Sequence, residues 1–260
     1  QVSTATADPI APAQSGRWQA AQTSVRDTLA ITDSTLGTMA AVVSAARVDV
    51  VAAAGGTQSA ADRQIYATKL TQALNHLVEL SNTTNANGAF LFAGSNSHAA
   101  PFVQSGSSVG YVGDDVQRLA DVGPGSRIAV TQSGSDAFMR IPSGNGVFAT
   151  SADAANTGTG VVNMGRVTDA AYLTGKAYQV QFHVASGVTT YVLIPDPKAP
   201  RKEVHPFPQG GRTIELPGMS FEITGAPADG DVFHVEPSTS SSLFDRMQRA
   251  IDALNDPATG

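Results

Sequence analysis

The sequence predicts an α+β, multidomain protein: a discontinuous long-helix bundle, or rod domain, with an inserted mainly-β domain. Residues 17–54 show the seven-residue apolar repeat of a long helix. Residues 105–236 show the alternation and turn signals of strands, and residues 243–254 return to the helical repeat. We therefore expect residues 1–104 and 237–260 to form the helical rod domain from both chain ends, and residues 105–236 to form an all-β outer domain.

Composition narrows the class of function. Charged residues make up 15% of the chain and the net charge is −6, which argues against nucleic acid as a partner, because that binding needs a basic face. There is no cysteine, so disulfides and thiolate chemistry are excluded. No uninterrupted run approaches 18 apolar residues, so we expect no membrane partner. The chain begins without Met and stops just beyond a helix, and we expect it to be a piece of a longer protein.

The first predicted helix covers residues 17–54 and would be roughly 55 Å long. Its buried seam steps by fours and threes through Trp18, Gln22, Val25, Leu29, Thr32, Leu36, Met39, Val43, Ala46, Val50 and Ala53. We expect residues 1–16, which contain Pro9 and Pro12, to be extended, and Gly55-Gly56 to end the helix. A compact enzyme rarely needs so long a helix, whereas an elongated assembly does.

Two further helices complete the rod domain. The second is capped by Thr57 or Ser59, runs to about Ser81 and packs back on the first as an antiparallel hairpin. The last is capped by Ser241 or Ser242, and its apolar face consists of Leu243, Met247, Ala250 and Leu254.

The segment after the second helix changes character. Residues 82–87 have turn composition, residues 88–94 read as a short apolar strand bounded by glycines, and Phe102-Val103 begins a return strand. This predicts a hairpin around Phe90 to Phe102. Residues 111–138 could belong to the rod domain rather than to the β domain.

The β domain is predicted from short alternating segments. Ala185-Ser186-Gly187-Val188 joins two of them as a hairpin, and the proline-rich residues 195–208 should form an irregular loop at a sheet edge. The candidate strands are 127–131, 177–184, 189–194, 213–216, 220–223 and 231–235.

No constellation in the sequence predicts catalysis. Gly106-Ser107-Ser108-Val109-Gly110 matches the G-x-S-x-G pattern of a hydrolase, but no helix pattern follows Ser108, so we interpret it as a chance match. Asp114-Asp115 and Asp229-Gly230-Asp231 do not extend to a calcium loop, and the second is a turn signal. Five histidines lack metal-ligand spacing: His76, His98, His183, His205 and His234. The sequence therefore predicts no enzyme, no catalytic residue, no cofactor and no metal site.

Residues 80–94, followed by Pro101-Phe102, resemble a passage that the flagellin family carries after two long helices. Matching blocks follow at Tyr111-Val112-Gly113-Asp114-Asp115 and at residues 225–233. The resemblance implies a helical rod domain made from both chain ends, a projecting β domain, and an innermost coiled-coil domain that is missing here.

The same resemblance implies a structural component of the bacterial flagellum. Within the flagellin family, the sequence resembles the junction proteins. This resemblance implies an adaptor that connects the hook, via hook-associated protein 1, to the flagellin filament and forms a ring with copies of itself. It also implies an extracellular protein, exported by the flagellar secretion apparatus. Two alternatives stay open: a flagellin filament subunit, and an extracellular β-domain adhesin or binding module.

The resemblance points to the segment from Phe90 to Phe102 as an axial contact between subunits. The suspected contact residues are Phe90, Leu91, Phe92, Pro101 and Phe102. An alternative remains open, in which these apolar residues cover the end of the helical bundle.

Overall fold

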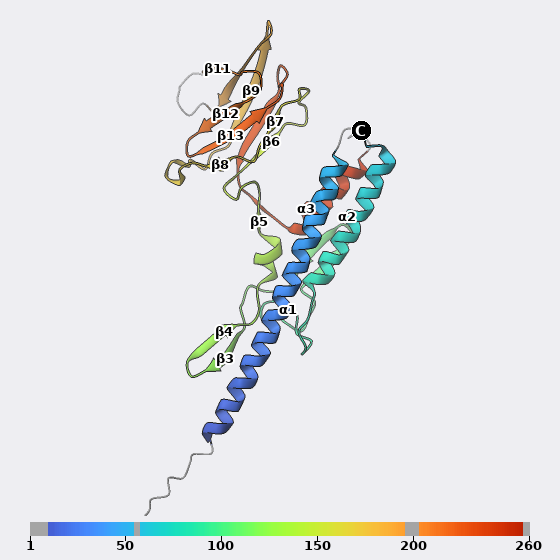
Figure 1. The fold of residues 1–260 in the computed structure, drawn as a ribbon, viewed down its shortest axis with the longest axis vertical. Helices are drawn as coiled ribbons and strands as arrows, with labels where there is room; N and C mark the ends of the chain where they lie inside the picture. The colour runs from blue at the N-terminus through green and yellow to red at the C-terminus, as the bar shows by residue number, and fades with distance from the viewer. Residues whose placement is uncertain (1–9, 55–57, 196–202, 257–260) are drawn as a thin grey trace, which may run out of the picture. The chain divides into compact units, whose positions relative to one another are not determined.

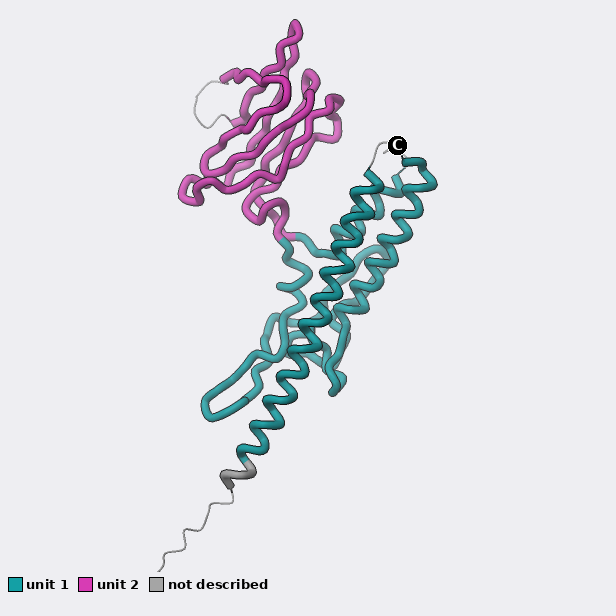
Figure 2. The backbone as a smooth tube through the Cα atoms, viewed as in Figure 1, with its two compact units in different colours: residues 1–141, 241–260 teal, residues 142–240 magenta. Residues whose placement is uncertain are grey.

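The computed structural model describes residues 10–54, 58–195 and 203–256. The chain divides into two compact units, residues 1–141 with 241–260 and residues 142–240, here called the helical unit and the β unit (Figure 2). The fold is α+β and multidomain, with the mainly-β part inserted between helical segments, as predicted (Figure 1).

The boundaries of the units differ from those expected at residues 104 and 237. Residues 105–141 belong to the helical unit, because Val109 and Phe138, each 4% exposed, are buried in the same core as the helices. The alternative that residues 111–138 belong with the rod domain therefore agrees with the structure.

Three α-helices form the helical unit: α1 Ile10–Ala53, α2 Ala60–Ser81 and α3 Leu243–Asn255. Helix α2 packs against both α1 and α3. Helix α1 begins before the predicted residue 17, because a proline at position 12 is tolerated in the first turn, where its missing N–H has no helical partner. Residues 1–9 and the predicted cap Gly55-Gly56 lie outside the described residues.

The N-terminal caps of α2 and α3 are serines, as predicted. The Ser59 hydroxyl accepts from the Asp62 backbone N–H at 3.1 Å, and the Asp62 carboxylate accepts in return from the Ser59 backbone N–H at 3.1 Å. The Ser242 hydroxyl accepts from the Asp245 N–H at 3.0 Å. Each cap satisfies a donor that the first turn leaves without a helical partner.

The buried face of α1 follows the predicted repeat only in part. Val25, Met39, Ala46 and Ala53 are buried, one in each of four heptads. At the alternate positions the face is turned by one residue, so that Thr28 and Thr35 are buried while Leu29 is 43% exposed. The prediction that Leu29 belongs to the buried seam is therefore wrong. The buried Thr35 is tolerated because its hydroxyl donates to the Ile31 carbonyl at 2.8 Å.

Residues 88–94 do not form the predicted strand. The two flanking glycines have positive φ, 74° at Gly88 and 68° at Gly94, and they turn the chain at both ends. The backbone N–H groups between them bond to loops: Phe90 to the Ser97 carbonyl and Leu91 to the Thr83 carbonyl. Only isolated bridges remain, so the hairpin predicted around Phe90 to Phe102 is absent.

Two other hairpins complete the helical unit. Strand β1, Phe102–Ser105, pairs with β2, Ser108–Tyr111, and β3, Leu119–Gly123, pairs with β4, Ser126–Ala129. One turn of π-helix, Ser135–Met139, follows.

The β unit contains two antiparallel sheets. One has the strand order β11-β10-β9-β14-β6, and in the other β12-β13-β7 is extended by β8, which also pairs with β13. Their bounds are β6 Phe148–Ala152, β7 Val161–Val162, β8 Arg166–Val167, β9 Tyr178–Ala185, β10 Val188–Ile194, β11 Val204–Pro206, β12 Arg212–Leu216, β13 Met219–Thr224 and β14 Val232–Pro237. A 3₁₀ turn, Ala170–Tyr172, precedes β9. The chain leaves the helical unit through β5, Ile141–Pro142, and returns to it through β15, Ser240–Ser241, and these two short strands pair with each other.

The core of the β unit lies between its sheets. The Phe182 ring is fully buried, and its centroid lies 5.0 Å from the ring centroid of Phe207 and 5.6 Å from that of Phe233. The predicted hairpin across Ala185–Val188 joins β9 to β10, and its central residues have φ of 52° and 78°, as a type I′ turn requires. Residues 196–202 of the proline-rich segment lie outside the described residues, and β11 forms the sheet edge beyond them.

Candidate functional site

Ser108 does not sit in a hydrolase nucleophile elbow. It begins strand β2 after the tight turn of the β1–β2 hairpin, and its hydroxyl donates to the Ser105 carbonyl at 3.0 Å. The elbow needs a strand-to-helix turn that exposes the serine, and a strand follows here instead. Among the described residues there is also no group of three His, Asp or Glu side chains that could hold a metal ion.

Four of the five suspected contact residues are buried in the chain's own core. Leu91, Phe92, Pro101 and Phe102 are buried, and Phe90 is half-buried. The four buried side chains are therefore not available to a neighbouring subunit in this structure. Their burial agrees with the alternative interpretation, in which these apolar residues cover the end of the helical bundle. Of the five, Phe90 is the one that is half-exposed.

An aromatic cluster explains this burial. The Phe102 ring centroid is 5.6 Å from that of Phe138 and 5.4 Å from that of Phe244, and Phe92 lies 5.0 Å from Phe138. Edge-to-face and tilted pairs at these distances are favourable beyond the area they bury. The cluster joins the loop after α2, the π-helical turn and helix α3, which are far apart in the sequence.

Asparagines hold the loop after α2, and sequence reasoning recognised them only as turn residues. The Asn82 side chain pairs with the backbone of Phe102, donating to its carbonyl at 2.9 Å and accepting from its N–H at 3.0 Å. The Asn85 side-chain oxygen accepts from the N–H groups of Asn87 and Ala89, both at 3.0 Å. The dense run of asparagines between residues 82 and 87 was the available signal.

The acidic pair Asp114-Asp115 links three loops. The Ser95 hydroxyl and backbone N–H donate to Asp114, and these hydrogen bonds lower the pKa of the Asp114 carboxyl. The Ser133 hydroxyl and the Arg140 guanidinium both donate to Asp115 at 2.6 Å and lower its pKa likewise. Both carboxylates are thereby used by the chain itself.

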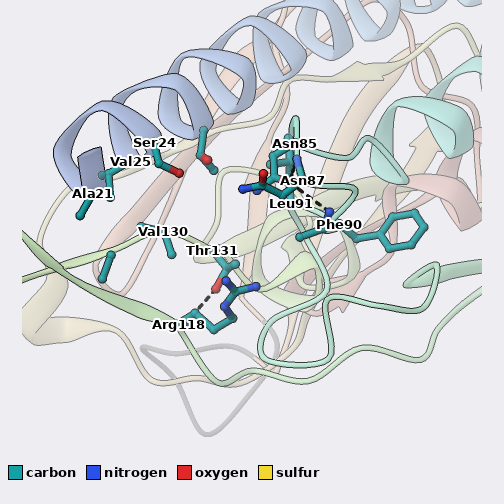
Figure 3. Close-up of a pocket in the computed structure, with 13 residues that line it drawn as sticks. Ala21, Ser24, Val25, Asn85, Asn87, Phe90, Leu91, Arg118, Val130 and Thr131 are labelled. Atoms are coloured by element: carbon teal, nitrogen blue, oxygen red, sulfur yellow. Dashed lines mark hydrogen bonds between the residues drawn. The ribbon is translucent and has the colours of Figure 1, made fainter. Parts of the chain in front are cut away.

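Between these loops and α1 lies a groove with two adjoining pockets, and Figure 3 shows the smaller of them. One measures about 210 Å³ and the other about 440 Å³, and they share Ser24 and Thr28 of α1 and Asn85 and Asn87 of the loop. Arg118 lines the first pocket, and its guanidinium donates to the Ser97 hydroxyl at 2.7 Å. Polar and apolar side chains together line the loop side of the groove, for example Arg118 and Leu91.

A second, apolar groove lies where the β3–β4 hairpin meets α1. It measures about 370 Å³, and Gln22 anchors it by donating to the Val122 carbonyl at 2.7 Å. Leu29 and Ile128, which line it, are 43% and 42% exposed. We call this surface the α1 apolar groove; it is lined by Gln22, Val25, Arg26, Leu29, Val122 and Ile128.

Helix α1 exposes much of its apolar surface. Residues 14–53 form a helix that is long and apolar enough to cross a membrane by length and composition alone. We had not expected this, because the sequence contains no uninterrupted run of 18 apolar residues. Only 17% of the most apolar window is buried within the described part of the chain. Long helices that pack in assemblies have the same composition, so this finding is weak evidence for a membrane span.

Comparison with known proteins places this architecture. Residues 4–97 match the bacterial flagellin N-terminal helical region. Flagellar hook-associated protein 3 of Salmonella typhimurium is 30% identical over 133 residues, which cover 51% of this chain and 41% of that protein. The matched chain thus spans about two fifths of the length of that curated relative.

Solved structures match over nearly the whole chain. The crystal structure of the flagellar junction protein FlgL from Legionella pneumophila superposes with a TM-score of 0.81 at 29% identity, covering 97% of this chain and 82% of that one. FlgL from Xanthomonas campestris gives a TM-score of 0.80 at 30% identity, covering 95% of this chain and 78% of that one. Since fold and sequence agree over most of both chains, the chain belongs to the flagellar hook-associated protein 3 (FlgL) family.

Proposed function

We propose that this chain is a structural subunit of the hook–filament junction of a bacterial flagellum, outside the cell and exported by the flagellar secretion apparatus. Its partners are hook-associated protein 1 on one side, flagellin on the other, and copies of itself. The chain contributes packing surface and no chemistry. Its similarity to a protein described as a flagellar junction protein, over 82% of that protein, supports this role over a filament subunit or an adhesin.

The exposed apolar surface of α1 is the observation on which the proposal depends. A helix of 44 residues with 17% of its most apolar window buried leaves large apolar side chains in water: Leu29, Val48 and Val51 are 43%, 66% and 67% exposed. Interfaces between subunits commonly bury exposed apolar side chains of this kind. We infer that α1 packs side by side with other helices in the assembled junction.

The α1 apolar groove is the most specific part of this surface. The half-exposed Leu29 and Ile128 flank a concave site whose floor is the buried Val25 and Val122. A neighbouring apolar side chain could fill it without any rearrangement of the chain. We propose this groove as the primary subunit contact, in place of the four buried residues Leu91, Phe92, Pro101 and Phe102; Phe90 lines a neighbouring pocket that shares Val25 with it.

A complementation experiment tests the role. The gene for hook-associated protein 3 is deleted in the source bacterium, and the complete gene is restored as wild type, as Leu29→Asp or as Val188→Asp. Val188 is a matched control, since it is a 60% exposed apolar residue of the β unit. We expect the wild type and Val188→Asp to restore attached filaments, and Leu29→Asp to leave hooks bare and release flagellin into the medium.

Two results would contradict the proposal. If the deletion leaves filaments attached and motility intact, the chain has no junction role. If the purified complete protein polymerises alone into long filaments, it is a flagellin. Normal motility of Leu29→Asp would reject the groove as a contact and leave the junction role standing.

A further inference from the structure

The sequence contains two Asn-Gly dipeptides, one in each unit: Asn87-Gly88 and Asn145-Gly146. In this dipeptide the backbone nitrogen of glycine can attack the side-chain carbonyl carbon of asparagine, because glycine has no Cβ to obstruct the approach. Asparagine is for this reason among the thermolabile residues. The two sites offer a comparison inside one molecule.

The backbone geometry of the two sites is alike. The Gly88 N–H donates to the Asn85 carbonyl at 2.9 Å, and the Gly146 N–H donates to the Ser143 carbonyl at 3.1 Å. Both glycines have positive φ, 74° and 91°, and both have open space where a Cβ would be. Each asparagine therefore occupies the third position of a tight turn, and the backbone gives no reason for different reactivity.

The side chains differ. The Asn145 oxygen accepts from the N–H groups of Val147 and Phe148, both at 3.0 Å, and its side-chain nitrogen is buried. Phe148 is a core residue with 2% exposure, so this arrangement is held by the interior of the β unit. To turn toward Gly146, the Asn145 carboxamide must break both hydrogen bonds.

Asn87 has no such restraint. Asn87 is exposed, and within the described residues no hydrogen bond holds the Asn87 carboxamide. The Asn85 side chain accepts a hydrogen bond from the backbone N–H of Asn87 and does not hold the Asn87 side chain. The side chain faces the groove beside α1, where water has access (Figure 3). It can rotate toward the Gly88 nitrogen without loss of a hydrogen bond.

We propose that Asn87 is a site of spontaneous deamidation in the folded protein and that Asn145 is protected by its hydrogen bonds. The Gly88 nitrogen loses its proton and bonds to the Asn87 side-chain carbonyl carbon, and the amide nitrogen leaves as ammonia. Water then opens the five-membered succinimide at either carbonyl, which gives aspartate or isoaspartate. One water is consumed and one ammonia is released, with no change in oxidation state.

The product alters the groove beside α1. It places a carboxylate on the wall shared by the two pockets, where Asp27 lines one and Arg118 lines the other. The isoaspartate form also lengthens the backbone by one carbon between the two N–H groups that Asn85 holds. The consequence for assembly rests on the proposed function, whereas the chemistry does not.

The test measures both sites in one sample. The chain is kept at mildly alkaline pH, folded in one arm and denatured in urea in the other, and conversion at each asparagine is followed by peptide mass spectrometry with isoaspartyl methyltransferase labelling. In the folded arm we expect Asn87 to convert at least about tenfold faster than Asn145, the factor that two ordinary hydrogen bonds supply. In urea we expect similar rates, because both sites are Asn-Gly.

Equal rates in the folded arm, or faster conversion at Asn145, would overturn the proposal. Asn87→Gln is the matched variant, since it keeps the amide but forms the larger ring slowly, and it should abolish the early conversion. These measurements use the chain without its partners. A result that overturns the deamidation proposal therefore leaves the proposed junction role untouched. In the complementation strain, Asn87→Asp compared with Asn87→Gln reports whether the new charge affects filament attachment.

Discussion

The two units bury apolar surface in different ways. In the β unit, residues from both sheets form one closed core, and Val180, Phe182, Ile223 and Phe233 have no exposed surface. In the helical unit, α2 contributes fully buried leucines, but only 17% of the most apolar window of α1 is buried within the described part of the chain. The β unit therefore closes its own core, whereas the helical unit leaves apolar side chains of α1 exposed, as the proposed packing against neighbouring subunits requires.

The largest expected effect tests the independence of the β unit. Phe182→Ala removes a fully buried ring at the centre of its aromatic cluster and should destabilise the β unit by about 3–5 kcal/mol. Protection of β9 and β14 amides should fall in hydrogen exchange, while α2 amides keep their protection. Val188→Ala, at an exposed position, is the control and should change stability by less than about 0.5 kcal/mol. Equal loss in α2 would show that the units fold as one.

A smaller effect is expected when a buried polar group of the β unit, the Asp231 carboxylate, is changed. The Asp231 carboxylate, 2% exposed, accepts from the N–H groups of Thr157, Gly158 and Ala228. Asp231→Asn replaces one acceptor by a donor that faces these N–H groups, and should cost about 1–3 kcal/mol in thermal or urea unfolding of the β unit.

Asp229→Asn provides the control for Asp231→Asn. Asp229 is exposed and accepts one backbone hydrogen bond, from Val184 at 2.9 Å. A cost at Asp229 as large as that at Asp231 would mean that burial is not the reason.

The smallest effect concerns the loops of the helical unit and depends on pH. The pKa of the Asp115 carboxyl is lowered by the Ser133 hydroxyl and then by Arg140. A folded-state pKa below the ordinary value of 3.8 means that the stabilisation is present above 3.8 and is lost as the pH falls through the folded-state pKa. Local opening of the loops around Asp115 should therefore increase at acid pH while α2 stays protected.

Hydrogen exchange between about pH 5 and pH 2, corrected for the intrinsic pH dependence of the exchange rate, measures this opening. Asp115→Asn should show more opening at neutral pH and a weaker further change on acidification. If the wild type and Asp115→Asn respond to acid identically, the pair with Arg140 does not hold the loops.

The sequence predicted the helices best, because their signals are local. Ser59 and Ser242 cap the helices where expected, and α2 ends at the predicted Ser81. The hairpin at Ser186-Gly187 was also predicted, since a type I′ turn needs residues that tolerate positive φ. Of the candidate site, the segment between Phe90 and Phe102 was recognised, but the sequence left open whether it contacts a subunit or covers the helical bundle, because an apolar residue reads the same in a core and in an interface.

The sequence by itself determined that three segments are helices, where α2 and α3 begin, and that helices from both ends of the chain belong to one unit. Only the tertiary structure decided that residues 105–141 join the helical unit and that residues 88–94 form a loop instead of a strand. It also decided that Thr28, and not Leu29, faces inward. The physical reason is that propensity, capping and turn chemistry act between near neighbours, whereas burial depends on which distant residues, such as Phe138 and Phe244 around Phe102, arrive at the same place.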